Sequence, residues 1–190
     1  MRKLILEEWM SLDGYIADKN GSLDFFTHLT PEQNTYSDND QLKFLETVDT
    51  VLLGRKTYEL FAAFWPDATT DKEVIADKLN ELPKLVVSNT ITRAPWGRWL
   101  DAGVISGDII DAIKKLKAQP GKNIVLWGSI SLAQTLMREN LIDEYHIQLC
   151  PVRLGGGKKL FPEESDFADL ELAEVRKYDT GTVFLNYRLK

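Results

Sequence analysis

Hydrophobic residues recur along this chain in two different patterns. Short runs are too brief for helices and are typical of strands buried on both faces. They lie near residues 4–10, 50–53, 84–88, 104–105 and 124–127. Other stretches repeat hydrophobic residues every three or four positions, which predicts helices with one buried face. These stripes are Leu42, Leu45 and Val48; Tyr58, Phe61, Ala62 and Trp65; Ile75, Leu79 and Leu82; Ile109, Ile110, Ile113 and Leu116; and Leu132, Ala133, Leu136 and Met137.

The last third of the chain adds antiparallel structure. Residues 145–149 alternate hydrophobic and polar side chains, which predicts a half-buried strand. Residues 170–178 and 182–189 are extended segments joined by Asp179, Thr180 and Gly181, a pattern that predicts a hairpin with a glycine bulge. Strands that alternate with helices and end in such a hairpin predict a three-layer α/β fold, with a mixed central sheet and helices on both faces.

Polar segments predict the connections. Residues 17–40 are mostly polar and are interpreted as one long surface loop that holds Phe25 and Phe26, of the kind that often forms a binding lid. Thr70 and Glu73 fit a capping box at the start of the helix that carries Ile75. Asp108 is predicted to cap the helix that follows it.

Composition narrows the class of protein. The 190 residues are 44% hydrophobic, enough for one domain that covers residues 1–190. A net charge of −6 argues against a nucleic-acid or anionic-membrane surface. Cys150 is the single cysteine, and the first residues form neither a signal peptide nor a membrane span, so we expect a cytoplasmic protein.

Two predicted strands end in turns that suit a phosphate. Gly128 and Ser129 separate the strand at 124–127 from a helix, whose first backbone N–H groups would point out of the turn. The segment from Gly54 to Thr57 places two cations and a hydroxyl at the start of another helix, where the dipole favours an anion. The alternative for this segment is an ordinary helix start with two solvated cations.

Residues 128–161 carry the most specific motif. The positions that define it are Gly128, Ser129, Ser131, Leu132, Leu141, Asp143, Glu144, Pro151, Val152, Leu154, Gly155, Gly157, Leu160 and Phe161. This pattern resembles the signature of the dihydrofolate reductase-like superfamily, in the branch related to the C-terminal reductase domain of the riboflavin-biosynthesis protein RibD. Ile130 stands where that signature has its middle glycine. The resemblance covers most of the chain and implies a dihydrofolate reductase-like fold, NADPH as cofactor and a homodimer.

The resemblance also implies a cofactor site. Gly54, Arg55, Lys56 and Thr57 resemble the G-R-x-T element with which dihydrofolate reductases grip the 2′-phosphate of NADPH. Ser88 and Asn89 could contact its adenosine end or simply form a turn, and Trp127 could be core or pocket wall. The remaining expected cofactor residues surround the second turn: Gly128, Ser129, Ile130, Ser131 and Leu132.

Two carboxylates are candidates for catalysis. Asp13 lies in an S-L-D-G segment that related riboflavin reductases place at the substrate end of their cleft, although a turn residue is an equally good interpretation. Asp40 is the runner-up. Glu7 and Tyr15 occupy positions where those reductases carry lysine and arginine, which argues against a ribose-phosphate substrate. A folate substrate is poorly supported too, because Asp40 alone lies near the first helix.

Other chemistry fits the sequence less well. Gly155 to Lys158 is not a phosphate loop, because Lys159 follows the lysine and Val152 replaces the first glycine. His28 and His146 share no metal-ligand spacing. We therefore expect an NADPH-dependent reductase that acts on a small heterocyclic or planar substrate and binds no metal, nucleic acid or membrane. The alternatives are the riboflavin-pathway reductase, which acts on a phosphoribosylamino-pyrimidine, and a non-catalytic nucleotide-binding module.

Overall fold

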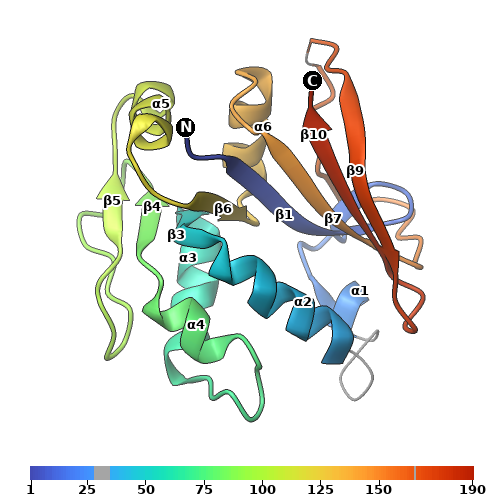
Figure 1. Cartoon of the computed structure of the whole chain (residues 1–190), viewed down its shortest axis with the longest axis horizontal. Helices are drawn as coiled ribbons and strands as arrows, with labels where there is room; N and C mark the ends of the chain where they lie inside the picture. Colours follow the sequence, from blue (N-terminus) through green and yellow to red (C-terminus); the bar gives the residue numbers. More distant parts are fainter. Residues whose placement is uncertain (28–34, 165) are drawn as a thin grey trace.

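A twisted mixed sheet forms the middle layer of the protein (Figure 1). The computed structural model describes residues 1–27, 35–164 and 166–190. Within these residues the sheet has eight strands in the order β5-β4-β3-β6-β1-β7-β10-β9. All neighbours are parallel except β10, which is antiparallel to β7 and to β9. The strands are β1 (Leu4–Ser11), β3 (Val48–Gly54), β4 (Lys84–Val87), β5 (Gly103–Ile105), β6 (Asn123–Trp127), β7 (Glu144–Cys150), β9 (Leu170–Lys177) and β10 (Val183–Leu189).

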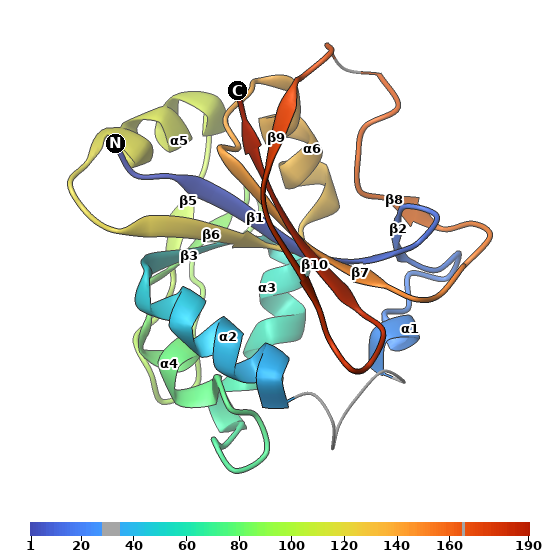
Figure 2. The ribbon, with the colours of Figure 1, turned by 45° about the vertical axis from the view of Figure 1, so that its right-hand side comes forward.

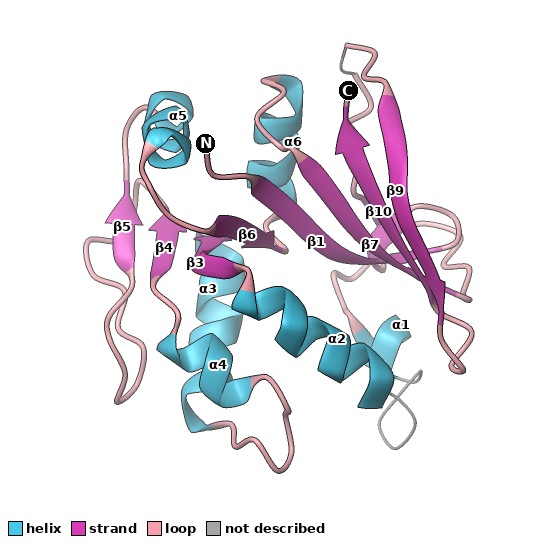
Figure 3. Cartoon of the chain, in the orientation of Figure 1, coloured by secondary structure: helices cyan, strands magenta, loops and turns pink. Residues whose placement is uncertain are grey.

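Helices cover both faces of this sheet (Figures 1 and 3). One hydrophobic core joins alternate strand residues, such as Leu6 and Leu126, to α5 (Ile109–Ala118) and α6 (Ile130–Arg138). A second core joins the intervening residues, such as Val51 and Val125, to α2 (Thr35–Glu46), α3 (Arg55–Ala62) and α4 (Ala76–Glu81). The expected three-layer α/β architecture is therefore confirmed.

Shorter elements complete the description. The one-turn helix α1 (Asp24–Thr27) and the 3₁₀ turn η1 (Trp65–Asp67) lie in connections. β2 (Tyr15–Ala17) pairs with β8 (Lys158–Lys159) in a separate antiparallel ladder. Among the helices described, none has the length and hydropathy needed to cross a bilayer.

β1 lies between β6 and β7, with parallel pairing on both sides. Its first residues are hydrophobic because helices cover both faces of the strand, and Leu4, Ile5 and Leu6 are fully buried. The buried stretch nevertheless continues through Glu7 and Glu8. These two carboxyl groups lie in the middle of the strand, where it lines the candidate site.

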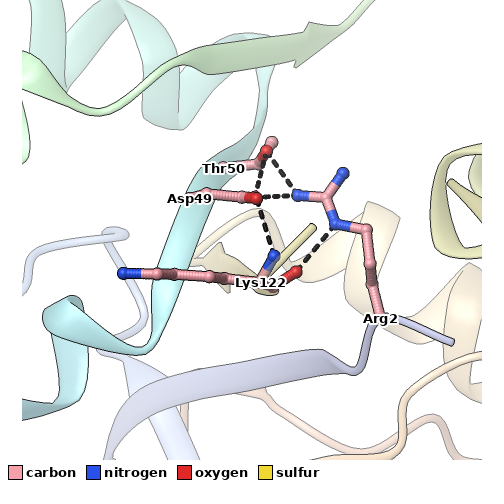
Figure 4. Close-up of polar contacts among 4 residues, drawn as sticks. All are labelled: Arg2, Asp49, Thr50 and Lys122. Carbon is pink, nitrogen blue, oxygen red and sulfur yellow. Dashed lines mark hydrogen bonds and ion pairs between the residues drawn. The ribbon is translucent and has the colours of Figure 1, made fainter. Parts of the chain in front are cut away.

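A polar cluster fastens the opposite, amino-terminal ends of the central strands (Figure 4). The Arg2 guanidinium donates to the Asp49 carboxylate and to the Thr50 hydroxyl, and its Nε donates to the Lys122 carbonyl at 2.7 Å. Asp49 also accepts from the Lys122 backbone N–H at 2.7 Å. These contacts tie the chain just before β1 to the starts of β3 and β6, far along the strands from the site.

The C-terminal hairpin forms as predicted (Figure 2). Its strands β9 and β10 form one edge of the sheet, with β9 outermost. Tyr178 N–H donates to the Thr182 carbonyl at 2.9 Å, and Gly181 N–H donates to the Tyr178 carbonyl at 3.0 Å. Gly181 has φ of +84°, the left-handed conformation that a glycine bulge requires.

Four predictions about elements are wrong. The described part of the segment 17–40 is not one loop, since the last residue of β2, all of α1 and the start of α2 lie in it, while residues 28–34 lie outside the described residues. The polar first half of α2 gave no hydrophobic period. Val48 belongs to β3 rather than to the helix before it, and Trp65 begins η1 after α3 has ended. β7 is not half-buried, because His146 and Gln148 on its polar face are as buried as its hydrophobic residues.

The two predicted helix caps differ in outcome. The capping box of Thr70 and Glu73 does not form, because the helix begins later, with Ile75 at its N-cap and no side-chain hydrogen bond. The cap at Asp108 is confirmed, since its carboxylate accepts from the Asp111 N–H at 3.0 Å.

Candidate functional site

A cleft of about 1770 Å³ opens at the carboxyl ends of β4, β3, β6 and β1. It is larger than the roughly 300–1,000 Å³ of an ordinary small-molecule pocket, which suits an extended ligand. Every residue that the sequence assigned to the cofactor lines it: Gly54, Arg55, Lys56, Thr57, Ser88, Asn89, Trp127, Gly128, Ser129, Ile130, Ser131 and Leu132. The sheet brings these three chain segments together because they end neighbouring parallel strands.

The turns after β3 and β6 are fastened to each other. The Ser129 hydroxyl accepts from the Gly54 N–H at 2.6 Å, and the Thr57 hydroxyl accepts from the Ser129 N–H at 2.9 Å. A Cβ on Gly54 would lie 3.0 Å from the Ser129 hydroxyl, and a Cβ on Gly128 would lie 2.8 Å from the Thr57 hydroxyl. The lack of a side chain at Gly54 and Gly128 therefore lets the two turns approach closely.

The start of α6 explains why isoleucine is tolerated at the motif's middle position. Ser129, not Ile130, carries the left-handed conformation, with φ of 64° and ψ of 50°. Ile130 is already the first residue of the helix, where any L-residue fits. The first turn of a helix leaves backbone N–H groups without intrahelical partners, and they lie at the cleft.

The start of α3 is cationic. Arg55 and Lys56 are its first two residues, both are exposed, and the first turn contains no acidic residue. Arg55 pairs with Glu59 one turn later at 2.8 Å. Cations at the positive end of a helix dipole are unfavourable alone, so an anion bound there would offset their repulsion.

The turn after β4 closes through side chains at the rim of the cleft. The Ser88 hydroxyl accepts from the Thr90 N–H at 3.1 Å, and the Asn89 carbonyl oxygen accepts from the Gly107 N–H at 2.9 Å. Both residues thus form the turn and line the cleft. Their contact with a cofactor stays a prediction.

Glu7 and Glu8 lie in the middle of β1, where Glu7 pairs with Trp127 at the end of β6, and both line the cleft. From the sequence, Glu7 was used only to argue against a ribose-phosphate substrate, and Glu8 was not considered. Glu7 accepts from the Trp127 indole N–H at 2.7 Å, and burial raises the pKa of Glu7. Burial, reinforced by the neighbouring Glu7 charge, raises the pKa of Glu8 to about 8, although a hydrogen bond from the Gly128 backbone lowers it. The sequence feature that could have identified both as site residues is two consecutive acidic residues directly after the hydrophobic run at residues 4–6.

With this geometry in place, the family can be stated. The model of the RibD C-terminal domain matches residues 2–184. The chain belongs to the RibD C-terminal domain family. It is 33% identical to the uncharacterised protein YyaP of Bacillus subtilis (strain 168), over 98% of this chain and 94% of that protein.

Solved structures resemble this RibD C-terminal domain over its whole length. A protein assigned provisionally to riboflavin biosynthesis, from Shewanella sp. PV-4, is 29% identical with a TM-score of 0.80, over 100% of this chain and 99% of the other. Dihydrofolate reductase from Enterococcus faecalis, in complex with NADP(H), has a TM-score of 0.60 at 14% identity. The match covers 99% of this chain and 96% of the reductase. The fold is therefore dihydrofolate reductase-like, and the family supports a reductase role.

Asp13 of this RibD C-terminal domain lies outside the group of residues described as lining the cleft. Its carboxylate accepts from the Ser11 hydroxyl at 2.7 Å and from the backbone N–H groups of Leu154 and Gly155 at 3.1 and 2.7 Å. Desolvation raises its pKa, but these hydrogen bonds outweigh that and hold the pKa of Asp13 below its usual value. The geometry is that of a turn anchor, and the catalytic role stays a prediction.

Asp40 lies elsewhere, on α2 beside a second cavity of about 300 Å³. It forms ion pairs with Arg176 and with Lys43, and it accepts from the Tyr178 hydroxyl at 3.2 Å. Glu7 and Gln41 line both cavities, so this polar chamber adjoins the cleft. The catalytic role of Asp40 also stays a prediction.

The histidines and the glycine-rich loop at residues 155–158 were weighed in the sequence analysis as metal and phosphate sites. His146 packs between Phe44 and Phe184, with ring centroids 4.8 and 5.3 Å away. His28 lies outside the described residues. No group of three or more potential metal ligands gathers in the described ranges. Gly157 lets the loop cross β2 closely, since a Cβ there would lie 2.0 Å from the Ala17 carbonyl.

Proposed function

We propose that this protein is an NADPH-dependent reductase that transfers a hydride to a small heterocyclic or planar substrate. The observation that carries the proposal is the order of groups along the cleft. Exposed cations begin α3, backbone N–H groups begin α6, and buried carboxyl groups lie in the middle of β1. An extended dinucleotide needs this order: cations for its 2′-phosphate, helix N–H groups for its pyrophosphate and an enclosed end for its nicotinamide.

The residues present fit this cofactor. Arg55 and Lys56 would bind the 2′-phosphate, and the first turn of α6 would bind the pyrophosphate. The nicotinamide supplies the hydride, and the chain contributes binding, orientation and exclusion of water. Trp127, held by its hydrogen bond to Glu7, would form the wall of the nicotinamide end. The NADP(H) complex of the Enterococcus faecalis reductase, which shares this fold, supports the same choice of cofactor.

The substrate end favours a neutral or cationic molecule. Glu7 and Glu8 are buried in the middle of β1, so a phosphate brought beside them would meet carboxyl groups instead of cations and would be repelled by either group when it is ionised. The riboflavin-pathway reductase remains the alternative, supported by the name of the Shewanella protein, and its substrate carries such a phosphate. A non-catalytic nucleotide-binding module would keep the cleft and lack turnover.

Arg55→Ala tests the cofactor assignment. Charge-assisted hydrogen bonds are worth about 1.5–3 kcal/mol, so the wild type should bind NADPH roughly ten- to a hundredfold more tightly than NADH. The substitution should remove most of that preference, because NADH lacks the phosphate that Arg55 binds. Titration of tryptophan fluorescence measures both affinities.

Arg93→Ala is the matched control, since Arg93 is an exposed cation paired with Asp101 at 3.5 Å and lies away from the cleft. It should leave the preference unchanged. Equal wild-type affinities for NADPH and NADH would contradict the assignment. NADPH oxidation with a panel of acceptors, including the phosphoribosylamino-pyrimidine, then separates the reductase from the riboflavin alternative and from the non-catalytic module.

A further inference from the structure

Glu8 has one carboxyl oxygen with no hydrogen-bond partner among the described residues. Its side chain is about nine-tenths buried, it lines the cleft, and Oε1 is the orphaned atom. Burying a polar group without a partner typically costs about 1–3 kcal/mol, so such an atom usually awaits a ligand or has a functional role. The Gly128 backbone hydrogen-bonds the same carboxyl group and so fixes it beside the turn at the start of α6.

The surroundings of Glu8 favour its neutral form. Glu7 precedes it on β1, and β7 places the apolar Ile147 opposite it. The neighbouring strand β7 also carries the titratable residues Glu144, Tyr145, His146 and Cys150, of which His146 acts on Glu7. The titratable groups that line the cleft with Glu8 include Tyr15, Arg55, Lys56, Lys72, Glu73, Arg138, Lys158, Lys159, Glu163 and Glu164. Burial comes first among the causes that raise the pKa of Glu8 to about 8. At neutral pH this carboxyl group is therefore mostly protonated.

The strand order places Glu8 at one end of the bound dinucleotide. From the turn of Ser88 on β4, the cleft crosses β3 and β6 to reach Glu8 on β1. These three inter-strand steps amount to roughly 14 Å. If the 2′-phosphate lies at Arg55 and the pyrophosphate at the start of α6, the nicotinamide ring arrives beside Glu8.

Resting on the proposed cofactor, we propose that Glu8 distinguishes the two redox states of the nicotinamide ring. The reduced ring is uncharged and tolerates the neutral carboxyl group. The oxidised ring carries a positive charge, and a carboxylate beside it is its counter-ion. Glu8 is thus a specificity-determining residue that ionises when NADP⁺ occupies the cleft.

The sign of the resulting pH dependence follows from linkage. An opposite charge within about 4–6 Å lowers the pKa of a carboxyl group by roughly 1–3 units. NADP⁺ binding should therefore release a proton below pH 8 and should tighten as the pH rises through that range. The affinity for NADPH should stay constant or fall as the pH rises, because the neutral ring does not stabilise ionised Glu8.

The experiment compares the affinities of the full-length protein for NADP⁺ and NADPH between pH 6 and pH 9. The 2′-phosphate and the cations that bind it titrate in the same way with both ligands. Their effect therefore cancels in the ratio of the two dissociation constants. The wild-type preference for NADPH over NADP⁺ should fall at least about tenfold across this range. In Glu8→Gln, whose amide mimics the protonated acid, the ratio should be independent of pH.

Glu7→Gln is the control, because it changes the neighbouring carboxyl group and leaves Glu8 in place. It should keep the pH dependence and move its midpoint to lower pH, since the Glu7 charge helps to raise the pKa of Glu8. Loss of the dependence in Glu7→Gln with retention in Glu8→Gln would assign the role to Glu7 and overturn the proposal.

Calorimetry of the wild type in two buffers with different ionisation enthalpies counts released protons without any variant. Greater proton release with NADP⁺ than with NADPH at pH 7 is the expected result. If both cofactors bind through Arg55 and their ratio does not change with pH, Glu8 lacks this role and the proposed function stands. If neither cofactor binds, the proposed function itself fails, and this inference fails with it.

Discussion

Glu8 shows how a single buried carboxyl group makes stability depend on pH. Its pKa is about 8 in the folded protein and near the ordinary 4.5 when the chain unfolds, so the folded state holds its proton over a wider range. The free energy of unfolding should therefore fall as the pH rises from about 4.5 to about 8, and this contribution should level off above that range.

Glu8→Gln removes that titration and should gain stability relative to the wild type as the pH rises. We expect the wild type to lose a few kcal/mol more than the variant between pH 5 and pH 8 in urea unfolding. Glu139→Gln, at an exposed position, should follow the wild type. Parallel wild-type and Glu8→Gln profiles would show that Glu8 is ionised in the folded protein at pH 7.

Asp13→Asn separates the two interpretations of that residue. An amide has one acceptor oxygen, whereas the Asp13 carboxylate receives two backbone N–H groups as well as the Ser11 hydroxyl. We expect about 1–2 kcal/mol of lost stability and unchanged NADPH affinity. Asp18→Asn is the matched control, because Asp18 also accepts from two backbone N–H groups, of Asn20 and Ser22.

The rate per folded molecule completes the test on the same preparations. A loss of about 10²- to 10⁴-fold in Asp13→Asn, with none in Asp18→Asn, would establish proton transfer by Asp13. Comparable rates would leave it as an anchor of the loop after β7.

At the scale of elements, the contact between the β3 and β6 turns shapes the part of the cleft where we propose that the phosphates bind. Gly128→Ala would add a methyl group 2.8 Å from the Thr57 hydroxyl at a residue with φ of +57°. We expect a loss of about 1–3 kcal/mol in unfolding free energy, together with weaker NADPH binding, because the start of α6 must shift.

Gly107→Ala separates steric from conformational causes. Gly107 also has a positive φ, of +82°, but a Cβ there would meet nothing within 4 Å. It should cost stability and leave NADPH affinity intact. Equal effects of both substitutions on binding would mean that the contact between the turns does not shape the site.

At the scale of the whole molecule, we propose a homodimer formed through the C-terminal hairpin. β9 is an edge strand with unpaired backbone groups, and it carries the exposed hydrophobic side chains of Leu172 and Val175. Light scattering should give about twice the 21.6 kDa of one chain. Val175→Lys should shift the mass toward one chain, and Leu60→Lys, an exposed position on α3, should not. A wild-type mass near 21.6 kDa at all concentrations would refute the proposal.

The sequence by itself determined the local structure and which strand ends line the cleft. The hydrophobic period, the cap at Asp108 and the bulge at Gly181 depend on a few neighbouring residues, so their effects can be predicted from the chain alone. Parallel strands end at one edge of a sheet, and this rule was enough to bring Gly54, Ser88 and Gly128 together.

Only the tertiary structure decided which polar residues are buried and what surrounds them. His146 and Gln148 alternate with hydrophobic residues as a solvent-facing row would, but α2 covers them, and nothing in β7 itself encodes that cover. Asp13 is held by backbone groups more than 140 positions away, and the orphaned oxygen of Glu8 results from the burial of its side chain in the middle of β1. Burial and pKa depend on packing between distant segments, and the sequence around a carboxyl group does not specify that packing.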